Sequence, residues 1–254
     1  MLRRLGRPLR LAALVGVLVL LIGCSVRSIS NSGYGAGNHQ GADNPFYKGE
    51  LTELDVLGID LAKPVSEAEI ARELDRHQGI ALRKRDTLLV LQSGALIPDD
   101  PMVRALGQYF GVTPFSGVPV PGPIQTASDT PGAGAPSYAT TLRLAAARSG
   151  ASTIICYWGL LESGVENHVT KAISWVPIVG AAIPDQSQHM RIRLKVAVID
   201  VRGGNWSTFA PEAYVDTALS ASLNRAASDQ EQVALLKEQA YKAAAEQLVA
   251  RYTR

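Results

Sequence analysis

Residues 190–201 alternate between apolar and polar side chains with a period of two, and this pattern constrains the fold more than any other feature of the chain. Successive side chains of a β-strand point to opposite faces, so the pattern predicts one long strand with one buried face and one exposed face. The two predicted faces carry Met190, Ile192, Leu194, Val196 and Val198 on one side, and Arg191, Arg193, Lys195 and Ala197 on the other. A Gly-Gly turn follows, and residues 206–214 are predicted to return as the second strand of a hairpin.

Two apolar runs upstream predict further strands, Thr87–Leu91 (TLLVL) and residues 152–161. Continuous apolar runs are typical of strands that are buried on both faces. Helices are predicted between them. Asp99 and Pro101 are typical of a helix start, and residues 138–149 form an alanine-rich helix that ends at a glycine.

The predicted fold class is α/β (α+β): a mixed β-sheet flanked by helices, in the order β-α-β-α-β, then a β-hairpin and a C-terminal helix. Strands joined through helices are expected to be parallel, and the last strands antiparallel. The single α/β domain is predicted to cover residues 50–254. Its remaining elements are a short strand or an extended lead-in at 51–59, a helix over 66–78, an edge or irregular strand over 112–120, a Pro/Gly loop at 121–137 and a closing helix over 229–252.

The first 23 residues have the pattern of a secretory signal peptide. Four arginines precede an apolar run at residues 11–22, which is shorter than the about 20 residues that span a bilayer. The run ends in Leu21-Ile22-Gly23-Cys24, which resembles the lipobox of bacterial lipoproteins. This resemblance implies cleavage after Gly23 and attachment of diacylglycerol and palmitate-type acyl chains at Cys24.

The same resemblance implies where the mature protein resides. Ser25 stands where an aspartate would indicate retention in the inner membrane, so we expect a cell-envelope protein in the outer membrane that faces the periplasm. Residues 24–49 are rich in Ser, Gly and Asn, and this composition predicts a flexible tether between the anchor and the domain.

The basic character of the full chain comes from the signal peptide. Removal of its four arginines lowers the formal net charge from +2 to about −2, which gives no support for a nucleic-acid partner. Cys156 is the only cysteine besides Cys24, so a lipidated chain has no intramolecular disulfide. Because Cys156 lies in an apolar run, we expect a buried structural thiol.

Residues 162–189 separate two predicted strands and form an apolar excursion. Its centre contains Trp175, Val176, Pro177, Ile178 and Val179, and the proline excludes a regular helix interior or a central strand. Two interpretations remain open: an exposed loop that contacts a partner, another copy or the membrane, or a plug that folds back over the sheet. If it is exposed, these five residues are the candidate partner-binding site.

A catalytic centre is not evident in the sequence. It contains no nucleophile elbow, phosphate-binding loop or zinc-protease motif, so we expect no cofactor, no metal site and no enzymatic activity. The alternative is a periplasmic hydrolase or metal-dependent enzyme that uses His168 and His189 with a nearby carboxylate. Glu162, Glu166 and Asp185 are the available acids.

Residues 86–252 also resemble the small α/β domain of several envelope lipoproteins. The resemblance is carried by TLLVL, by the helix–strand unit LRLAAARSGASTIICYWG and by the strand–turn–strand RLKVAVIDVRGGNW. The similar proteins are activators of penicillin-binding proteins, the curli secretion lipoprotein, a polysaccharide-export accessory lipoprotein and the N-terminal domain of TolB. The resemblance implies a protein-binding or self-assembling role in envelope assembly or export.

Overall fold

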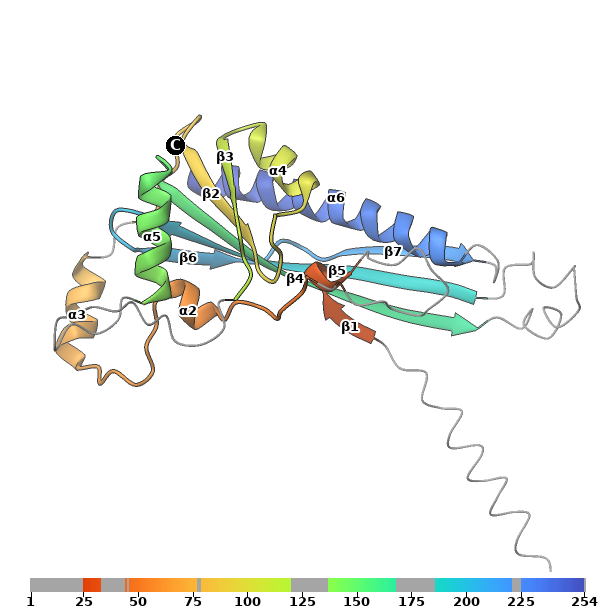
Figure 1. The fold of residues 1–254 in the computed structure, drawn as a ribbon, viewed down its shortest axis with the longest axis horizontal. Coiled ribbons are helices and arrows are strands. Elements are labelled where there is room, and N and C mark those ends of the chain that lie inside the picture. Colours follow the sequence, from red (N-terminus) through yellow and green to blue (C-terminus); the bar gives the residue numbers. More distant parts are fainter. Residues whose placement is uncertain are drawn as a thin grey trace, which may run out of the picture.

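The computed structural model describes residues 25–32, 44, 46–76, 79–119, 137–167, 186–220 and 225–253 (Figure 1). Its elements follow one another in this order: β1 (Ser25–Ser28), a 3-10 helix η1 (Ile29–Asn31), α2 (Glu53–Leu57), α3 (Glu67–Arg76), β2 (Thr87–Gln92), α4 (Asp100–Gly107), β3 (Gly111–Phe115), α5 (Tyr138–Arg148), β4 (Thr153–Asn167), β5 (Gln186–Asp200), β6 (Trp206–Phe209), β7 (Tyr214–Ser220) and α6 (Arg225–Tyr252).

The strands form one mixed sheet, as the sequence predicts. The central order is β3-β2-β4-β5-β6, in which β2 is parallel to both β3 and β4 and the later pairs are antiparallel. The long β4–β5 hairpin is the axis of the sheet. One side of it pairs with β2 and then β1, and the other side pairs with β6 and then β7. Pro114 lies in the edge strand β3, where a residue without an amide hydrogen is tolerated.

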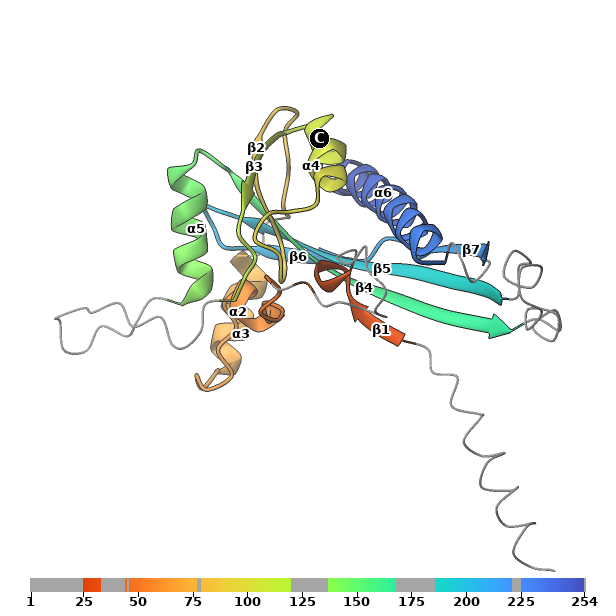
Figure 2. The same cartoon turned by 45° about the vertical axis from the view of Figure 1, so that its right-hand side comes forward.

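Helices cover the two faces of this sheet to different extents (Figures 1 and 2). On one face, α4 and α6 pack over apolar side chains that include Leu88, Val90 and Val198. On the other face, α2 and α5 cover Cys156 and Ile199. Further along β4 and β5, this second face carries exposed residues of four strands: Val26, Leu160, Arg191, Arg193 and Val215. No helix in the described part of the chain combines the length and the apolar character needed to cross a bilayer.

Two short helices lie between the N-terminal segment and β2. The prediction of a short strand or an extended lead-in at 51–59 is wrong, because these residues include the helix α2. Thr52 caps α2 by accepting a hydrogen bond from the Asp55 amide at 3.1 Å. The predicted helix over 66–78 corresponds to α3, where the Ser66 hydroxyl accepts from the Glu69 amide at 3.2 Å. Ile70 of α3 is exposed.

The two strands that flank the predicted apolar excursion at 162–189 extend into it from both sides. Residues 162–167 belong to β4 and residues 186–189 belong to β5, and they pair in register from Glu162↔Arg191 to Asn167↔Gln186. The Pro/Gly loop at 121–137 lies outside the described residues up to Ser137, which caps α5.

Residues 25–32 lie within the predicted flexible tether over residues 24–49, but they form a strand and a 3-10 helix. Ser25 to Ser28 form β1, which pairs antiparallel with β4 from Ser25↔Ser163 to Ser28↔Leu160. Ile29 follows and is only 1% exposed, within the core cluster under α6. The composition of the segment is typical of a linker, but one large apolar side chain and a strand partner are enough to order it.

Ile29 fills a space that a glycine in β4 leaves open. A Cβ atom on Gly159 would overlap Ile29 Cδ1 and would lie 2.8 Å from Ile29 Cγ1. Any larger residue at position 159 would therefore displace Ile29 and, with it, β1 and the rest of the N-terminal segment. The contact between Gly159 and Ile29 therefore holds the N-terminal segment against the middle of β4.

We predict that Ile29→Ala and Gly159→Ala each destabilise the protein and that their effects are not additive. Ile29→Ala leaves a cavity and should cost about 2–4 kcal/mol, whereas Gly159→Ala overpacks and should cost about 1–3 kcal/mol. In the double variant the atoms that clash are gone, so a coupling energy of about 1 kcal/mol or more is expected in urea unfolding. Simple additivity would contradict this packing.

A second prediction concerns Glu162 on the uncovered face of the sheet. Hydrogen bonding from Arg191, together with the charges of Arg191 and Arg193, lowers the pKa of the Glu162 carboxyl from 4.5. A lowered pKa stabilises the fold above the ordinary pKa, and this contribution is lost as the pH falls through the folded-state value.

Glu162→Gln should therefore destabilise the protein at pH 7 by at most about 1 kcal/mol, and the difference from the wild type should shrink toward pH 3. Urea unfolding at both pH values measures this effect. Glu238→Gln on the exposed side of α6 is the matched control, with no difference expected at either pH. A Glu162→Gln effect of the same size at both pH values would show that the ion pair is not its cause.

Candidate functional site

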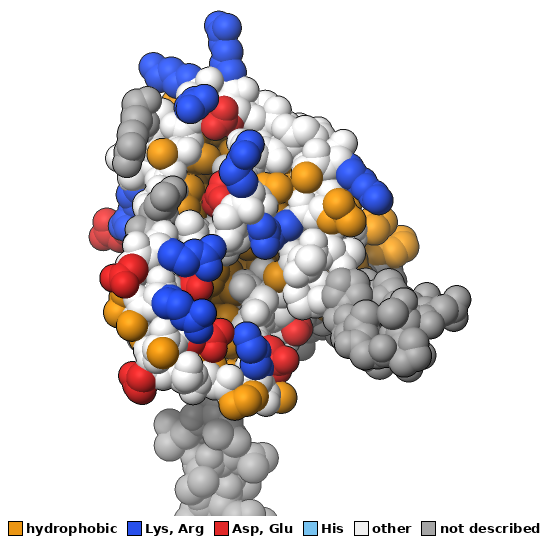
Figure 3. All heavy atoms as spheres, turned by 90° about the vertical axis from the view of Figure 1, so that its left-hand side faces the viewer, with side chains coloured by type: hydrophobic (Ala, Val, Ile, Leu, Met, Phe, Trp, Pro, Cys, Tyr) orange, Lys and Arg blue, Asp and Glu red, His pale blue; other side chains and the backbone are white. Residues whose placement is uncertain are grey.

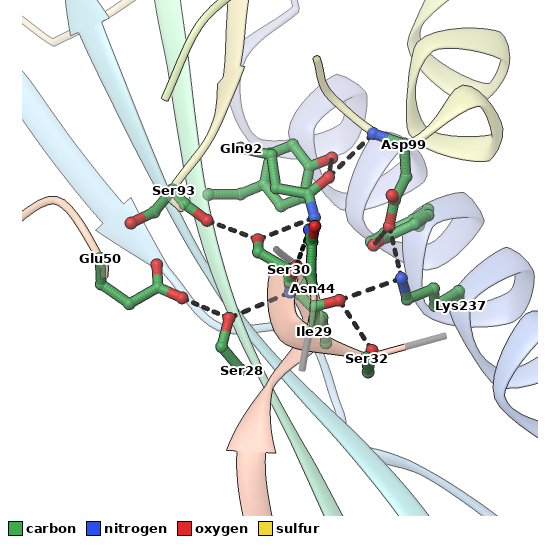
Figure 4. A network of polar contacts seen from close by, with 12 residues as sticks. Ser28, Ile29, Ser30, Ser32, Asn44, Glu50, Gln92, Ser93, Asp99 and Lys237 are labelled. Atoms are coloured by element: carbon green, nitrogen blue, oxygen red, sulfur yellow. Dashed lines mark hydrogen bonds and ion pairs between the residues drawn. The ribbon is translucent and has the colours of Figure 1, made fainter. Parts of the chain in front are cut away.

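Polar side chains gather at the carboxyl end of β2, where the N-terminal segment crosses the sheet (Figure 4). The carboxyl ends of parallel strands are where α/β sheets ordinarily bind ligands. In this protein, residues of the N-terminal segment occupy that edge. We call this group of contacts the anchor seat, and its members are Ser28, Ile29, Ser30, Asn44, Glu50, Gln92, Ser93, Asp99, Tyr157, Lys237 and Tyr241.

Gln92 lies at the centre of the anchor seat and is 1% exposed. Its side-chain nitrogen donates to the Ser30 hydroxyl at 2.9 Å, and its side-chain oxygen accepts from the Tyr157 hydroxyl at 2.6 Å. The same oxygen accepts from the backbone amide of Asp99 at 2.8 Å. A single buried amide therefore connects the N-terminal segment, β4 and the start of α4.

The N-terminal segment makes its own contacts around Ser30. The Ser30 hydroxyl donates to the Ser93 carbonyl at 2.5 Å, and the Asn44 side chain donates to the Ser30 carbonyl at 3.0 Å. Nearby, the Ser28 hydroxyl donates to the Glu50 carboxylate. These bonds satisfy polar groups that burial would otherwise penalise by about 1–3 kcal/mol each.

Helix α6 closes the anchor seat from the other side through Asp99. The Asp99 carboxylate accepts from the Tyr241 hydroxyl at 2.5 Å and pairs with the Lys237 ammonium at 2.9 Å. The ammonium also donates to the Ile29 carbonyl at 3.1 Å. Lys237 thus bridges an acid of the domain and the backbone of the segment that follows Cys24, as Figure 4 shows.

The two tyrosines of the seat act as hydrogen-bond donors and not as acids. Burial raises the pKa of both hydroxyls well above the ordinary value, and the nearby Asp99 charge raises them further. Their rings also pack edge to face, with centroids 5.6 Å apart. Both tyrosines remain protonated at any physiological pH, so the anchor seat is suited to holding a segment in place.

The functional residues predicted from the sequence are not members of the anchor seat. Cys24, His168 and Trp175–Val179 lie outside the described residues, and His189 lies in β5 opposite Gly164. No group of three or more His, Cys, Asp or Glu side chains suited to a metal ion occurs in the part of the chain that the structure describes. Cys156 is buried as predicted, and burial raises the pKa of its thiol well above the ordinary value.

The anchor seat was not predicted from the sequence. Ser28, Ser30 and Asn44 belong to a stretch whose composition is typical of a linker, and the two partners of the Ser30 hydroxyl lie more than sixty positions away. One signal was present. Gln92 and Ser93 directly follow the buried run TLLVL, and polar residues at the end of a buried strand need partners.

We predict that Gln92→Leu destabilises the protein by about 2–4 kcal/mol. The substitution keeps the side-chain volume but leaves the Tyr157 hydroxyl and the Asp99 amide without their acceptor. Urea unfolding followed by tryptophan fluorescence measures the effect. Gln108→Leu, an exposed glutamine after α4, is the control and should change stability by less than about 0.5 kcal/mol. Equal effects would contradict a structural role for the network.

Comparison with known proteins places the chain in a family. Residues 52–251 match the family model described as YafT bacterial lipoprotein. No curated protein matches the chain. Among solved structures, a variant PelC dodecamer from Paraburkholderia phytofirmans is similar at 14% sequence identity and a TM-score of 0.25, over 66% of this chain and 95% of the PelC chain. So low a TM-score supports no argument about this protein. The family match covers most of the chain and confirms the prediction of a bacterial lipoprotein: the chain belongs to the YafT family of bacterial lipoproteins.

Proposed function

We propose that the protein is an outer-membrane lipoprotein, anchored by acyl chains on Cys24, whose periplasmic domain binds another envelope protein or further copies of itself in envelope assembly or export. Trp175, Val176, Pro177, Ile178 and Val179 are the proposed contact residues. The domain acts by binding and not by catalysis.

The observation that carries this proposal is the position of β1. It begins at Ser25, directly after Cys24, and pairs with β4 opposite Ser163. A flexible tether would let the domain search a large volume, whereas a paired strand next to the lipidated residue holds the domain close to the membrane. A lipoprotein held in this way is suited to contacts at or near that surface.

The β4–β5 hairpin supports the choice of contact residues. Beyond Ser163, β4 continues to Asn167 and remains paired with β5 as far as Gln186. Because β1 and β4 are antiparallel, β1 starts at the end of the sheet toward which β4 runs (Figure 1). Residues 168–185, which include the five apolar residues, follow β4 and precede β5 in the sequence, and we expect them near the anchor. A partner of these residues is expected near the membrane.

The alternative of a hydrolase that uses His168 and His189 gains no support from the described residues. His189 lies in a β-strand, His168 lies outside the described part of the chain, and the family match names a lipoprotein without an activity.

Site-specific crosslinking in living cells tests the proposed contact. A photoreactive amino acid at Ile178 of the full-length protein should give a discrete adduct, either with one envelope protein or with a second copy. The matched control is the same amino acid at Leu235, an exposed apolar position on α6 that should give no adduct. Adducts of equal yield at both positions, or adducts with lipid alone at Ile178, would contradict a protein contact there.

A further inference from the structure

Basic side chains gather at the end of the sheet where the parallel strands begin. They come from three separate stretches of the sequence: Arg83, Lys84 and Arg85 before β2, Arg148 at the end of α5, and Arg202 after β5. We call these five residues the basic edge. Figure 3 looks onto this end of the molecule, and Lys and Arg side chains predominate over its upper part.

Backbone hydrogen bonds bring the three stretches together. The Ser152 amide donates to the Thr87 carbonyl at 3.0 Å, which joins the start of β4 to the start of β2. The Val201 amide donates to the Ser152 carbonyl at 3.0 Å, which brings in the turn after β5. Arg143 fixes that turn by donating to the carbonyls of Val201 and Arg202 at 2.9 and 2.8 Å.

The cations of the basic edge have no acidic partner among the described residues. All five are exposed. The acids closest to these cations in the sequence, Asp86 and Asp200, accept hydrogen bonds from the backbone amides of Arg83 and Gly203. Since the mature chain has a formal net charge of about −2, this concentration of positive charge is a local feature.

Arg85 adopts a strained backbone conformation within the basic edge. Its φ is 72°, in the left-handed region, and it is the only non-glycine residue with a positive φ among the described residues. Glycine would adopt this conformation without steric cost, so the chain keeps a cation at a position that disfavours a side chain. Strain of this kind is typical of functional sites.

The basic edge lies at the opposite end of the sheet from the lipid anchor. It adjoins Thr153 at the start of β4, whereas β1 begins opposite Ser163. Ten residues of strand separate these points, a distance of about 33 Å. The edge therefore faces away from the membrane that holds the protein, and the headgroups of that membrane are not its partner.

One exposed aromatic side chain lies at the start of the strand that follows the Arg202 turn. Trp206 begins β6, directly after the turn that carries Arg202, and is 42% exposed. It pairs with Ile199, whose side chain lies on the face covered by α5, so Trp206 and the α5 residue Arg148 belong to the same side of the sheet. A flat aromatic ring can pack on the apolar face of a sugar, while arginines bind carboxylates.

We propose that the basic edge, with Trp206, binds an acidic glycan that lies away from the anchoring membrane. Arg148 and Arg202 bind the carboxylates of the glycan, and Trp206 packs against a sugar ring. An acidic protein surface is the other class of partner that such cations attract, and the experiment separates the two.

The test measures binding of the full-length protein in nanodiscs of zwitterionic lipid to polygalacturonate, a carboxylated glycan, and to uncharged dextran. The wild type should bind polygalacturonate, more weakly at 300 than at 50 mM NaCl, and should not bind dextran. Arg148→Glu/Arg202→Glu should weaken binding at least about tenfold, because each removes a charge-assisted contact. Arg72→Glu/Lys242→Glu, an equal charge change at exposed sites on α3 and α6, should weaken it less than about twofold.

Arg85→Gly provides a variant that removes a cation without unfolding the protein. It should leave the melting temperature unchanged or raise it, because the strained residue is gone, and should weaken glycan binding about twofold or more. Two results would overturn the proposal: equal losses in the two charge-reversal variants, or no binding of the wild type to polygalacturonate, whether or not it captures an acidic envelope protein.

Discussion

The packing of Ile29 against Gly159 is the contact on which the rest of the structure depends. A glycine in the middle of a long strand leaves a space on the sheet, and the Ile29 side chain, which follows β1, fills it. Once Ile29 is seated there, β1 is aligned with β4, and the Ser30 hydroxyl meets Gln92. Lys237 then reaches the Ile29 carbonyl from α6. One apolar contact therefore sets the position of a polar network that spans the domain.

This arrangement bears on what the proposed lipid anchor at Cys24 would do for the domain. An anchor at the end of a flexible linker fixes only the distance from the membrane, whereas an anchor beside a paired strand also limits the orientation of the domain. The β4–β5 hairpin then extends on the anchor side, and the basic edge lies at the far end of the same strands. The basic edge and the far end of the hairpin are thus separated along one sheet.

Much of this fold could be predicted from local patterns. The period-two alternation at 190–201, the buried run TLLVL and the helix–glycine–strand unit before β4 each determine their own element, and the strand directions follow from the connections. The seat of the N-terminal segment could not be predicted in this way. Ser30, Gln92 and Lys237 are distant in sequence, and no periodicity links them. The basic edge was hidden for the same reason, because net charge does not reveal which cations the fold brings together.

The central claim is that residues 25–32 are an ordered part of the sheet and not a tether. Amide hydrogen exchange on the full-length lipoprotein in nanodiscs tests it most directly. We predict that the amides of residues 26–31 exchange slowly, with protection close to that of the central residues of β4, because opening them requires Ile29 to leave the core. Exchange of these amides at the rate of an unstructured peptide would contradict the account.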